Sequence, residues 1–216
     1  MTIDKDDLLN SILASISRID YVKSTDIPNI DLYMDQVTSF MDKELKSTKR
    51  YEDDKILTKT MINNYAKNDL LPPPVKKKYS KEHLMVLTFI YYFKNLLSIG
   101  DIEKLLAPIT EKFFHADDSI DIARIYDEVC ECDKKRTHIL QEDIKSAFEA
   151  SKDTFLDTEG EDKELLQYFS FICMLSLDVY VKKQIIEKLI NLASAGKESD
   201  KKDPEKKEKK EKKDKK

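Results

Sequence analysis

The chain has 216 residues, of which 37% are charged and 40% hydrophobic, with no Trp and a formal net charge of −4. It contains 3 glycines, where an average usage near 7% predicts roughly 15. They are isolated, so no Gly-rich phosphate loop can be assembled, and Asn-Gly or Asp-Gly hairpin turns are absent. This composition argues against enzymes built on nucleotide loops and against an all-β chain, and it predicts a mainly α-helical protein.

The net charge conceals a strong asymmetry along the chain. Residues 1–54 carry a net charge of −5 and residues 107–196 a net of −8, whereas residues 55–106 carry +5 and residues 197–216 carry +4. A basic block of about fifty residues inside an acidic body is the electrostatic pattern that an account of function must explain.

The first predicted domain, residues 1–27, is an amphipathic helix that Asp4 can cap. Its apolar residues are spaced along one helical stripe. They are Leu9, Ile12, Leu13, Ile16 and Ile19. Ile27-Pro28-Asn29 breaks the chain, and Asp31 can cap a second helix. A polar stretch from Ser47 to Asp54 follows.

The basic block begins with a short predicted helix from an N-cap at Thr58 to about Lys67. Pro72-Pro73-Pro74 ends this helix, because proline lacks the backbone donor and restricts the residue before it. A short basic strand or loop follows, and further helices are predicted to begin at Ser80 and at Ser98, where Ser98 and Asp101 form a capping-box pattern.

Three further helices are predicted over 119–133, 138–150 and 161–194. The last is apolar nearly all round from Tyr168 to Val181, which predicts burial on several sides. These 14 residues include Asp178 and are too few to span a bilayer. Residues 107–196 are therefore expected to form a helical dimerisation or effector domain, and the Lys/Glu-rich tail, 197–216, is expected to be disordered.

The order of elements from Leu57 to Leu106 is informative. A short helix is followed by Leu70-Leu71-Pro72, a basic loop, a helix beginning at Tyr79-Ser80 and another beginning at Ser98. This order resembles the DNA-binding head of MerR-type winged helix-turn-helix regulators. The whole chain looks like an uncharacterised bacterial domain-of-unknown-function family with such a head, here over residues 28–106.

The resemblance assigns roles position by position. Thr58 matches the small polar residue that opens the recognition helix of the MerR-type head. Asn63-Asn64-Tyr65 lies where that family usually has Arg-Tyr-Tyr, and Asp69 replaces the Gly before Leu-Leu-Pro. Lys76-Lys77-Lys78 replaces the Gly-Tyr-Arg of the wing tip. The connection over 47–57 is longer than the family's tight turn.

The residue types point to the same chemistry as the resemblance. Lysines bind backbone phosphate, and an Asn side chain can bond bidentately to an adenine edge in the major groove. The stiff proline loop would position the lysines that follow it at a low entropic cost. The expected DNA-binding residues are Thr58, Lys59, Thr60, Asn63, Asn64, Lys67, Lys76, Lys77, Lys78 and Tyr79.

Other chemistry has little support in the sequence. Cys130 and Cys132 point about 200° apart on a helix, so they read as packing residues and not as metal ligands of a site with His138. Cys173 also reads as packing, and His83 and His115 as surface or boundary residues. No nucleophile arrangement indicates catalysis, and we expect no metal and no cofactor.

The sequence therefore predicts a transcriptional regulator without enzymatic activity. We expect a mainly α protein with a MerR-like winged helix-turn-helix head and a C-terminal helical bundle, which reads double-stranded DNA as a cytoplasmic homodimer. The acidic N-terminus lacks a signal-peptide pattern, and no membrane association is expected. The alternative is a helical protein-interaction module without DNA binding. The effector ligand cannot be named.

Overall fold

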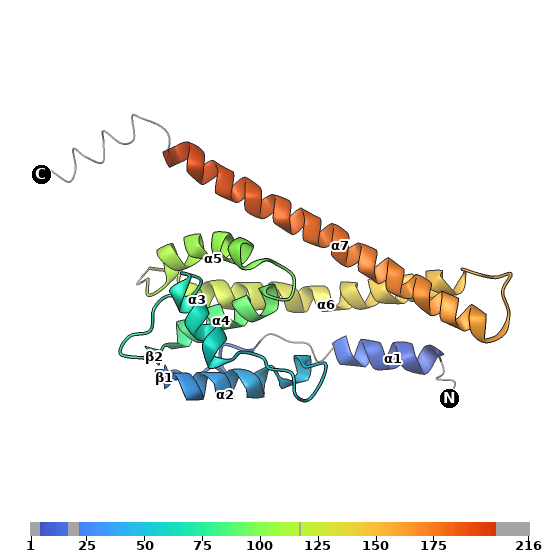
Figure 1. Cartoon of the computed structure of the whole chain (residues 1–216), viewed down its shortest axis with the longest axis horizontal. Coiled ribbons are helices and arrows are strands. Elements are labelled where there is room, and N and C mark those ends of the chain that lie inside the picture. Colours follow the sequence, from blue (N-terminus) through green and yellow to red (C-terminus); the bar gives the residue numbers. More distant parts are fainter. Residues whose placement is uncertain (1–4, 17–21, 117, 202–216) are drawn as a thin grey trace, which may run out of the picture.

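The computed structural model describes residues 5–16, 22–116 and 118–201. Its elements follow one another in the order α1 (Lys5–Ile16), β1 (Leu32–Tyr33), α2 (Met34–Glu44), the 3-10 helix η1 (Lys46–Thr48), α3 (Lys59–Lys67), β2 (Lys78–Tyr79), α4 (Lys81–Phe93), α5 (Ile99–Phe113), α6 (Ile122–Lys152) and α7 (Gly160–Lys201) (Figure 1). Within these residues the two strands form one small antiparallel sheet, with Leu32 opposite Tyr79. The expected mainly helical fold class is confirmed.

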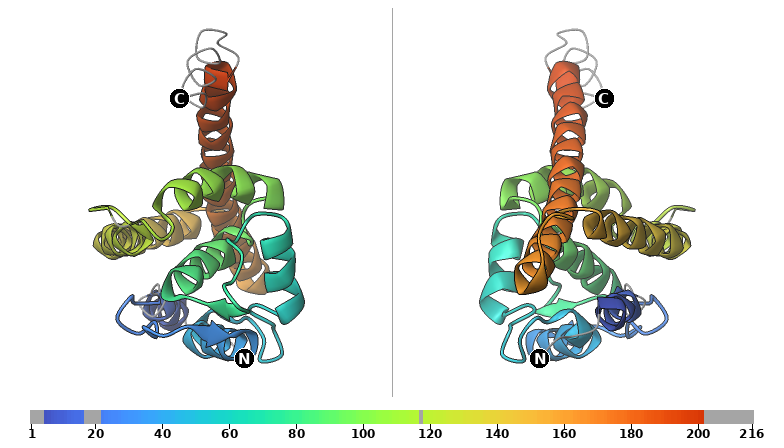
Figure 2. Two further views of the ribbon diagram at one scale, coloured as in Figure 1. Left: turned by 90° about the vertical axis from the view of Figure 1, so that its left-hand side faces the viewer. Right: turned by 90° about the vertical axis from the view of Figure 1, so that its right-hand side faces the viewer.

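Helix α4 forms the centre of the core. Its sequence is an apolar run, and every residue from His83 to Tyr91 is buried. A helix that is apolar all round must be covered on every side. Figure 2 shows α4 between α5 on one side and α2 on the other, flanked by α3 and α6. This packing fixes the short helix α3 and the small sheet on a rigid body.

Three of the predicted helix starts are confirmed. Thr58, Ser80 and Ser98 are the N-cap residues of α3, α4 and α5. The Ser98 hydroxyl oxygen accepts from the Asp101 backbone N–H at 3.2 Å. Asp31 does not cap α2, because that helix begins only after Tyr33. The predicted cap at Asp4 lies outside the described residues.

The C-terminal helices are longer than the sequence predicted. The expected break between 133 and 138 is wrong, because α6 is continuous from Ile122 to Lys152 and this stretch contains neither Gly nor Pro. Cys130 is buried as expected, but Cys132 and Cys173 are exposed, so their predicted packing roles are wrong. Gln141 on α6 donates a hydrogen bond from Nε2 to the carbonyl oxygen of Leu13, which places α1 against α6.

Helix α7 forms a hairpin with the end of α6 and then runs back across the molecule toward α5 (Figure 1). The predicted burial of its apolar segment on several sides is wrong, since Phe169, Leu177 and Tyr180 are exposed. Within α7, Gly160–Ala195 is long and apolar enough to cross a membrane by length and composition, although the 14-residue stretch is not. The helix continues to Lys201, and residues 202–216 of the predicted disordered tail lie outside the described residues.

Candidate nucleic-acid interface

Helix α3 presents one polar face to solvent and one apolar face to the core. Ile62 and Tyr65 are buried on the inner face, which anchors the helix. The outer face carries exposed polar side chains at helical spacing. They are Thr60, Asn63, Asn64 and Lys67. A carboxamide pair flanked by a hydroxyl and an ammonium group provides the donors and acceptors that base edges recognise.

The beginning of α3 uses two of the predicted site residues for structure. The Thr58 hydroxyl oxygen accepts from the Met61 backbone N–H at 3.2 Å, which satisfies one of the unpaired donors of the first turn. The exposed ammonium group of Lys59 forms an ion pair with Asp35, near the start of α2. Thr58 is therefore a half-buried helix cap, and the charge of Lys59 is already partly compensated.

Helix α3 ends in a left-handed residue. Asp69 has a φ of 56°, and the following Leu70 backbone N–H donates to the Tyr65 carbonyl oxygen at 3.0 Å. This is the 6→1 bond of a Schellman motif, in which Gly is the usual left-handed residue. The position at which the resemblance places Gly thus requires the conformation that glycine favours.

The segment after the prolines is a tight two-residue hairpin, which we call the wing turn, Val75–Lys78. The Lys78 backbone N–H donates to the Val75 carbonyl oxygen at 2.9 Å, and these two residues form a β-bridge. Lys76 and Lys77 occupy the central positions with φ values of 51° and 64°. Two consecutive left-handed residues define a type I′ turn, for which Asn-Gly or Gly-Gly is the usual sequence.

The wing turn exposes its two central lysines. Lys76 and Lys77 are exposed, and within the described residues neither side chain has a hydrogen bond or an ion pair. Lys78 is half-buried, with its Nζ 5.2 Å from the centre of the Tyr33 ring. A left-handed backbone costs an L-residue roughly 1–2 kcal/mol. The wing turn therefore holds two free cations in a conformation that their backbone does not favour.

Tyr79 does not belong to the exposed surface. Only 3% of this residue is accessible to solvent, and its ring lies edge-on at 5.5 Å from the ring of His83. Burial raises the pKa of the Tyr79 hydroxyl. Tyr79 was expected among the DNA-contacting residues, but its side chain is buried in the core, next to the strand pairing with Leu32. The buried Tyr79 side chain anchors the strand that follows the wing turn in the core.

His83, which the sequence predicted at the surface or boundary, lies in the core. It is buried, its Nδ1 accepts from the Ser80 backbone N–H at 2.9 Å, and its ring lies 4.7 Å from Phe114. Burial lowers the pKa of His83 to about 4, so the ring is neutral at pH 7. The Ser80-x-x-His83 spacing was the available signal, because the third helical residue can close a capping box. His115, expected at the surface or boundary, is half exposed and pairs with Glu82.

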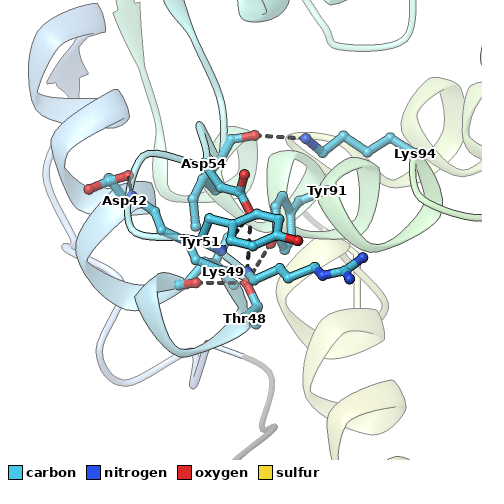
Figure 3. A network of polar contacts seen from close by, with 10 residues as sticks. Asp42, Thr48, Lys49, Tyr51, Asp54, Tyr91 and Lys94 are labelled. Atoms are coloured by element: carbon cyan, nitrogen blue, oxygen red, sulfur yellow. Dashed lines mark hydrogen bonds and ion pairs between the residues drawn. The ribbon is translucent and has the colours of Figure 1, made fainter.

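The connection between α2 and α3 is held in place by contacts with α2 and α4 (Figure 3). The Lys94 ammonium donates to the Ile56 carbonyl oxygen at 2.8 Å, and the hydroxyl groups of Thr48 and Tyr91 share a hydrogen bond. Lys49 forms an ion pair with Asp42 at 2.7 Å. The long connection is thus an ordered part of the head.

A groove of about 950 Å³ lies between this connection and α2. Its lining includes six basic side chains, which are Lys43, Lys46, Lys49, Arg50, Lys55 and Lys59. Three of them, Lys46, Arg50 and Lys55, have no ion pair within the described residues. The lining also includes the carboxylates of Asp42 and Glu52, so the groove has a net positive charge next to the beginning of α3.

Sequence reasoning did not select Lys46, Arg50 and Lys55. The available signal was the recurrence of basic residues at 46, 49, 50 and 55 on both sides of the acidic run Glu52-Asp53-Asp54. A net charge over a long window averages such local groups away. Of the acidic run, Asp54 accepts from the backbone N–H groups of Arg50 at 3.1 Å and Tyr51 at 3.0 Å, whereas Glu52 lines the groove.

The predicted site residues other than Tyr79 lie on α3 with its N-cap Thr58 and in the wing turn. The outer face of α3 and the wing turn both lie in the head, away from the turn between α6 and α7 (Figure 1). Lys59 connects the outer face of α3 to the basic groove, whereas Tyr79 belongs to the core. Among the described residues no three His, Cys, Asp or Glu side chains are grouped so that they could hold a metal ion.

The fold of this head defines a helical module with a small two-stranded sheet and a basic hairpin turn. Residues 22–129, half of the chain, match the family described as domain of unknown function (DUF1836), and the chain belongs to this family. No curated protein and no solved structure matches the chain. The expected membership of an uncharacterised family is confirmed. The match covers the head and ends inside α6, so α7 lies outside it.

Proposed function

We propose that this protein is a DNA-binding transcriptional regulator with a MerR-like winged helix-turn-helix head. In this proposal Asn63 and Asn64 of α3 read base edges in the major groove, while Lys67 and the wing lysines contact backbone phosphates. The regulator acts in the cytoplasm as a homodimer, so that two heads meet two half-sites. No catalytic step is involved.

The observation that carries this proposal is the wing turn. Lys76 and Lys77 occupy left-handed positions where Asn-Gly would be unstrained, and both side chains point their charge into solvent without a partner in the described chain. Backbone strain that persists in a folded protein is concentrated at functional sites. Two free cations at the tip of a hairpin are suited to a DNA backbone, which carries one negative charge per about 1.7 Å of helix axis.

The basic groove extends the same surface. Lys46, Arg50 and Lys55 line the groove that also contains Thr58 and Lys59 at the beginning of α3, and they form no ion pair within the described residues. The position of Asp69 gives further support, because its left-handed backbone is the conformation required where MerR-type heads have Gly. These features favour a shared local architecture between the head and that class.

The proposal is tested by the salt dependence of DNA binding. Fluorescence anisotropy with a random-sequence duplex measures the dissociation constant between about 50 and 200 mM salt. Changing Lys76, Lys77 and Lys78 to Ala should lower the log–log slope by about 2–3, since each phosphate contact contributes about 0.9. The matched control changes Lys134, Lys135 and Arg136 on α6 to Ala, which removes the same charge outside the predicted site.

An unchanged slope in the wing variant would contradict the phosphate contacts. Base reading has its own test, which is enrichment of bound sequences from a random DNA pool. The Asn63→Ala variant should lose preference at one base position by about 1–3 kcal/mol, while Asn10→Ala on α1 should keep it.

The alternative function is a helical protein-interaction module without DNA binding. The ion pair between Lys59 and Asp35 favours it, because this pair neutralises a cation at the start of the supposed recognition helix. Even non-specific DNA-binding proteins have dissociation constants of roughly 10⁻⁴–10⁻⁶ M at physiological salt and bind more tightly at low salt. A complete lack of binding at micromolar protein in low salt would therefore select the alternative.

A further inference from the structure

Helix α7 carries a continuous apolar ridge on its exposed surface. Seven apolar side chains follow one another at intervals of four residues, and all seven residues are exposed. They are Leu165, Phe169, Cys173, Leu177, Val181, Ile185 and Leu189. Residues four apart form one of the ridges by which helices interlock with other helices. Exposed apolar patches of this size mark interaction sites on proteins.

The middle of α7 is exposed to solvent. The first part packs against the end of α6, where the rings of Phe171 and Phe148 lie 5.3 Å apart and Gln167 donates to the Lys152 carbonyl oxygen at 2.7 Å. The last part returns to the core through Ile190, which is 4% exposed. Between these two contacts, all residues from 176 to 182 are exposed. Leu177, the midpoint of the ridge and 63% exposed, lies in this bridge.

The charges of α7 are distributed unequally between its two halves. The first half, residues 160–178, carries Glu161, Asp162, Glu164, Asp178 and one Lys, for a net charge of −3. The second half, residues 179–195, carries three Lys and one Glu, for a net charge of +2. Two such helices attract each other when they run antiparallel, and they place like charges together when they run parallel.

We propose that two copies of this chain pair through α7, in antiparallel orientation, with the ridges crossing near Leu177. The contact is isologous, as in most homodimers, because the same ridge of each copy packs into the groove of the other. This inference deepens the homodimer part of the proposed function by naming the pairing surface. It does not depend on DNA binding by the head.

A lipid bilayer is a less suitable partner for the same surface. The segment in which every residue is exposed has seven residues, which span about 10 Å at 1.5 Å per residue. A bilayer core is about 30 Å thick and requires about 20 residues. Insertion of the longer segment would break the contacts of Phe171 and Ile190 with the body, and it would bury the exposed pair of Asp178 and Lys182.

The experiment measures the mass of the full chain by sedimentation velocity without DNA. We expect a dimer of the 25.2 kDa chain, and a dimer dissociation constant at least about 30-fold higher for Leu177→Glu, which places two carboxylates at the crossing point. The control is Ile30→Glu, which changes an equally exposed apolar residue (67%) near β1 and should leave the dimer intact. Far-UV circular dichroism checks that both variants keep their helix content.

A second measurement tests the orientation. With Cys132 changed to Ser, a chain that keeps Cys173 is mixed with a chain that carries Cys173→Ser and Val181→Cys, both at exposed positions. Mild oxidation should cross-link the mixture but neither chain alone, because antiparallel ridges that cross at residue 177 bring position 173 of one copy next to position 181 of the other, whereas parallel ridges bring like positions together. Ile139→Cys on α6, used in place of Val181→Cys, should give no cross-link with Cys173. A monomeric natural chain, or a dimer unaffected by Leu177→Glu, would overturn the proposal. A monomer that co-sediments with phosphatidylglycerol vesicles would assign the ridge to lipid instead.

Discussion

Replacing Lys76 by Asn and Lys77 by Gly tests two effects of the wing turn separately. One is the effect of its left-handed backbone on the stability of the fold, and the other is the effect of its two lysines on DNA binding. The two lysines have φ values of 51° and 64°, and relief of the left-handed strain is worth roughly 1–2 kcal/mol per residue. Asn tolerates this conformation better than Lys, and Gly adopts it freely. Against this gain, Gly adds about 0.5–1 kcal/mol of backbone entropy to the unfolded chain. With full relief at Lys77 and partial relief at Lys76, the double variant should therefore be more stable by at least about 1 kcal/mol.

Thermal unfolding followed by circular dichroism measures this change. A gain of 1 kcal/mol corresponds to an increase in Tm of about 2–4 °C for a chain of this size. The same variant removes two cations from the tip, so the log–log slope of DNA binding should fall by about 2. A variant that is more stable and binds DNA with an unchanged slope would refute the view that strain is retained here for phosphate contact. An unchanged Tm would refute the strain itself.

Three further predictions concern the supports of the head. Asp69→Gly should stabilise the fold by about 0.5–1 kcal/mol in chemical denaturation without changing DNA affinity, since it relieves a φ of 56°. The pKa of His83 is about 4 in the folded protein and about 6.5 in the unfolded chain, so between these pH values only the unfolded state binds a proton. The free energy of unfolding should therefore fall by about 2 kcal/mol as the pH is lowered from 7 to 5. His83→Gln should remove this pH dependence while its side chain still closes the capping box with Ser80. Lys94→Met should cost about 2 kcal/mol and speed hydrogen exchange in residues 46–57, because the Ile56 carbonyl oxygen loses a charged donor and burial already lowers the Lys94 pKa.

The local signals in the sequence predicted the head well. Capping residues are chemically specific, and Thr58, Ser80 and Ser98 begin helices where the spacing of polar and apolar residues indicated. Ile62 and Tyr65 are three residues apart, so helical periodicity places them on the same face of α3, and both are buried. These properties depend on neighbours within one turn of helix, so they can be read from one sequence without tertiary information.

Properties that depend on distant residues were not predictable in the same way. The burial of Tyr79 follows from its pairing with β1, more than forty residues earlier in the chain. The exposure of α7 contradicts its composition, because an apolar helix is expected to be buried when only one copy of the chain is considered. The conflict between composition and exposure disappears if the covering surface belongs to a second copy.

Because glycine is scarce in this chain, most of the left-handed backbone positions that the structure describes are occupied by other residues. Among the described residues such positions are occupied by Asp69, Lys76, Lys77, His115 and Phe155, and by glycine at Gly160. Positions that must be left-handed for the fold alone gain stability from glycine and lose nothing, as expected for Asp69 at the end of α3. Lys76 and Lys77 differ from Asp69 because they are consecutive, lie at the tip of a hairpin and carry positive charge. If these positions lacked glycine only because glycine is rare in this sequence, Asp69→Gly and the change of Lys76-Lys77 to Asn-Gly would both stabilise the protein. Neither change would then weaken DNA binding. A loss of binding at the wing turn alone would show that the strain is retained there in exchange for positive charge.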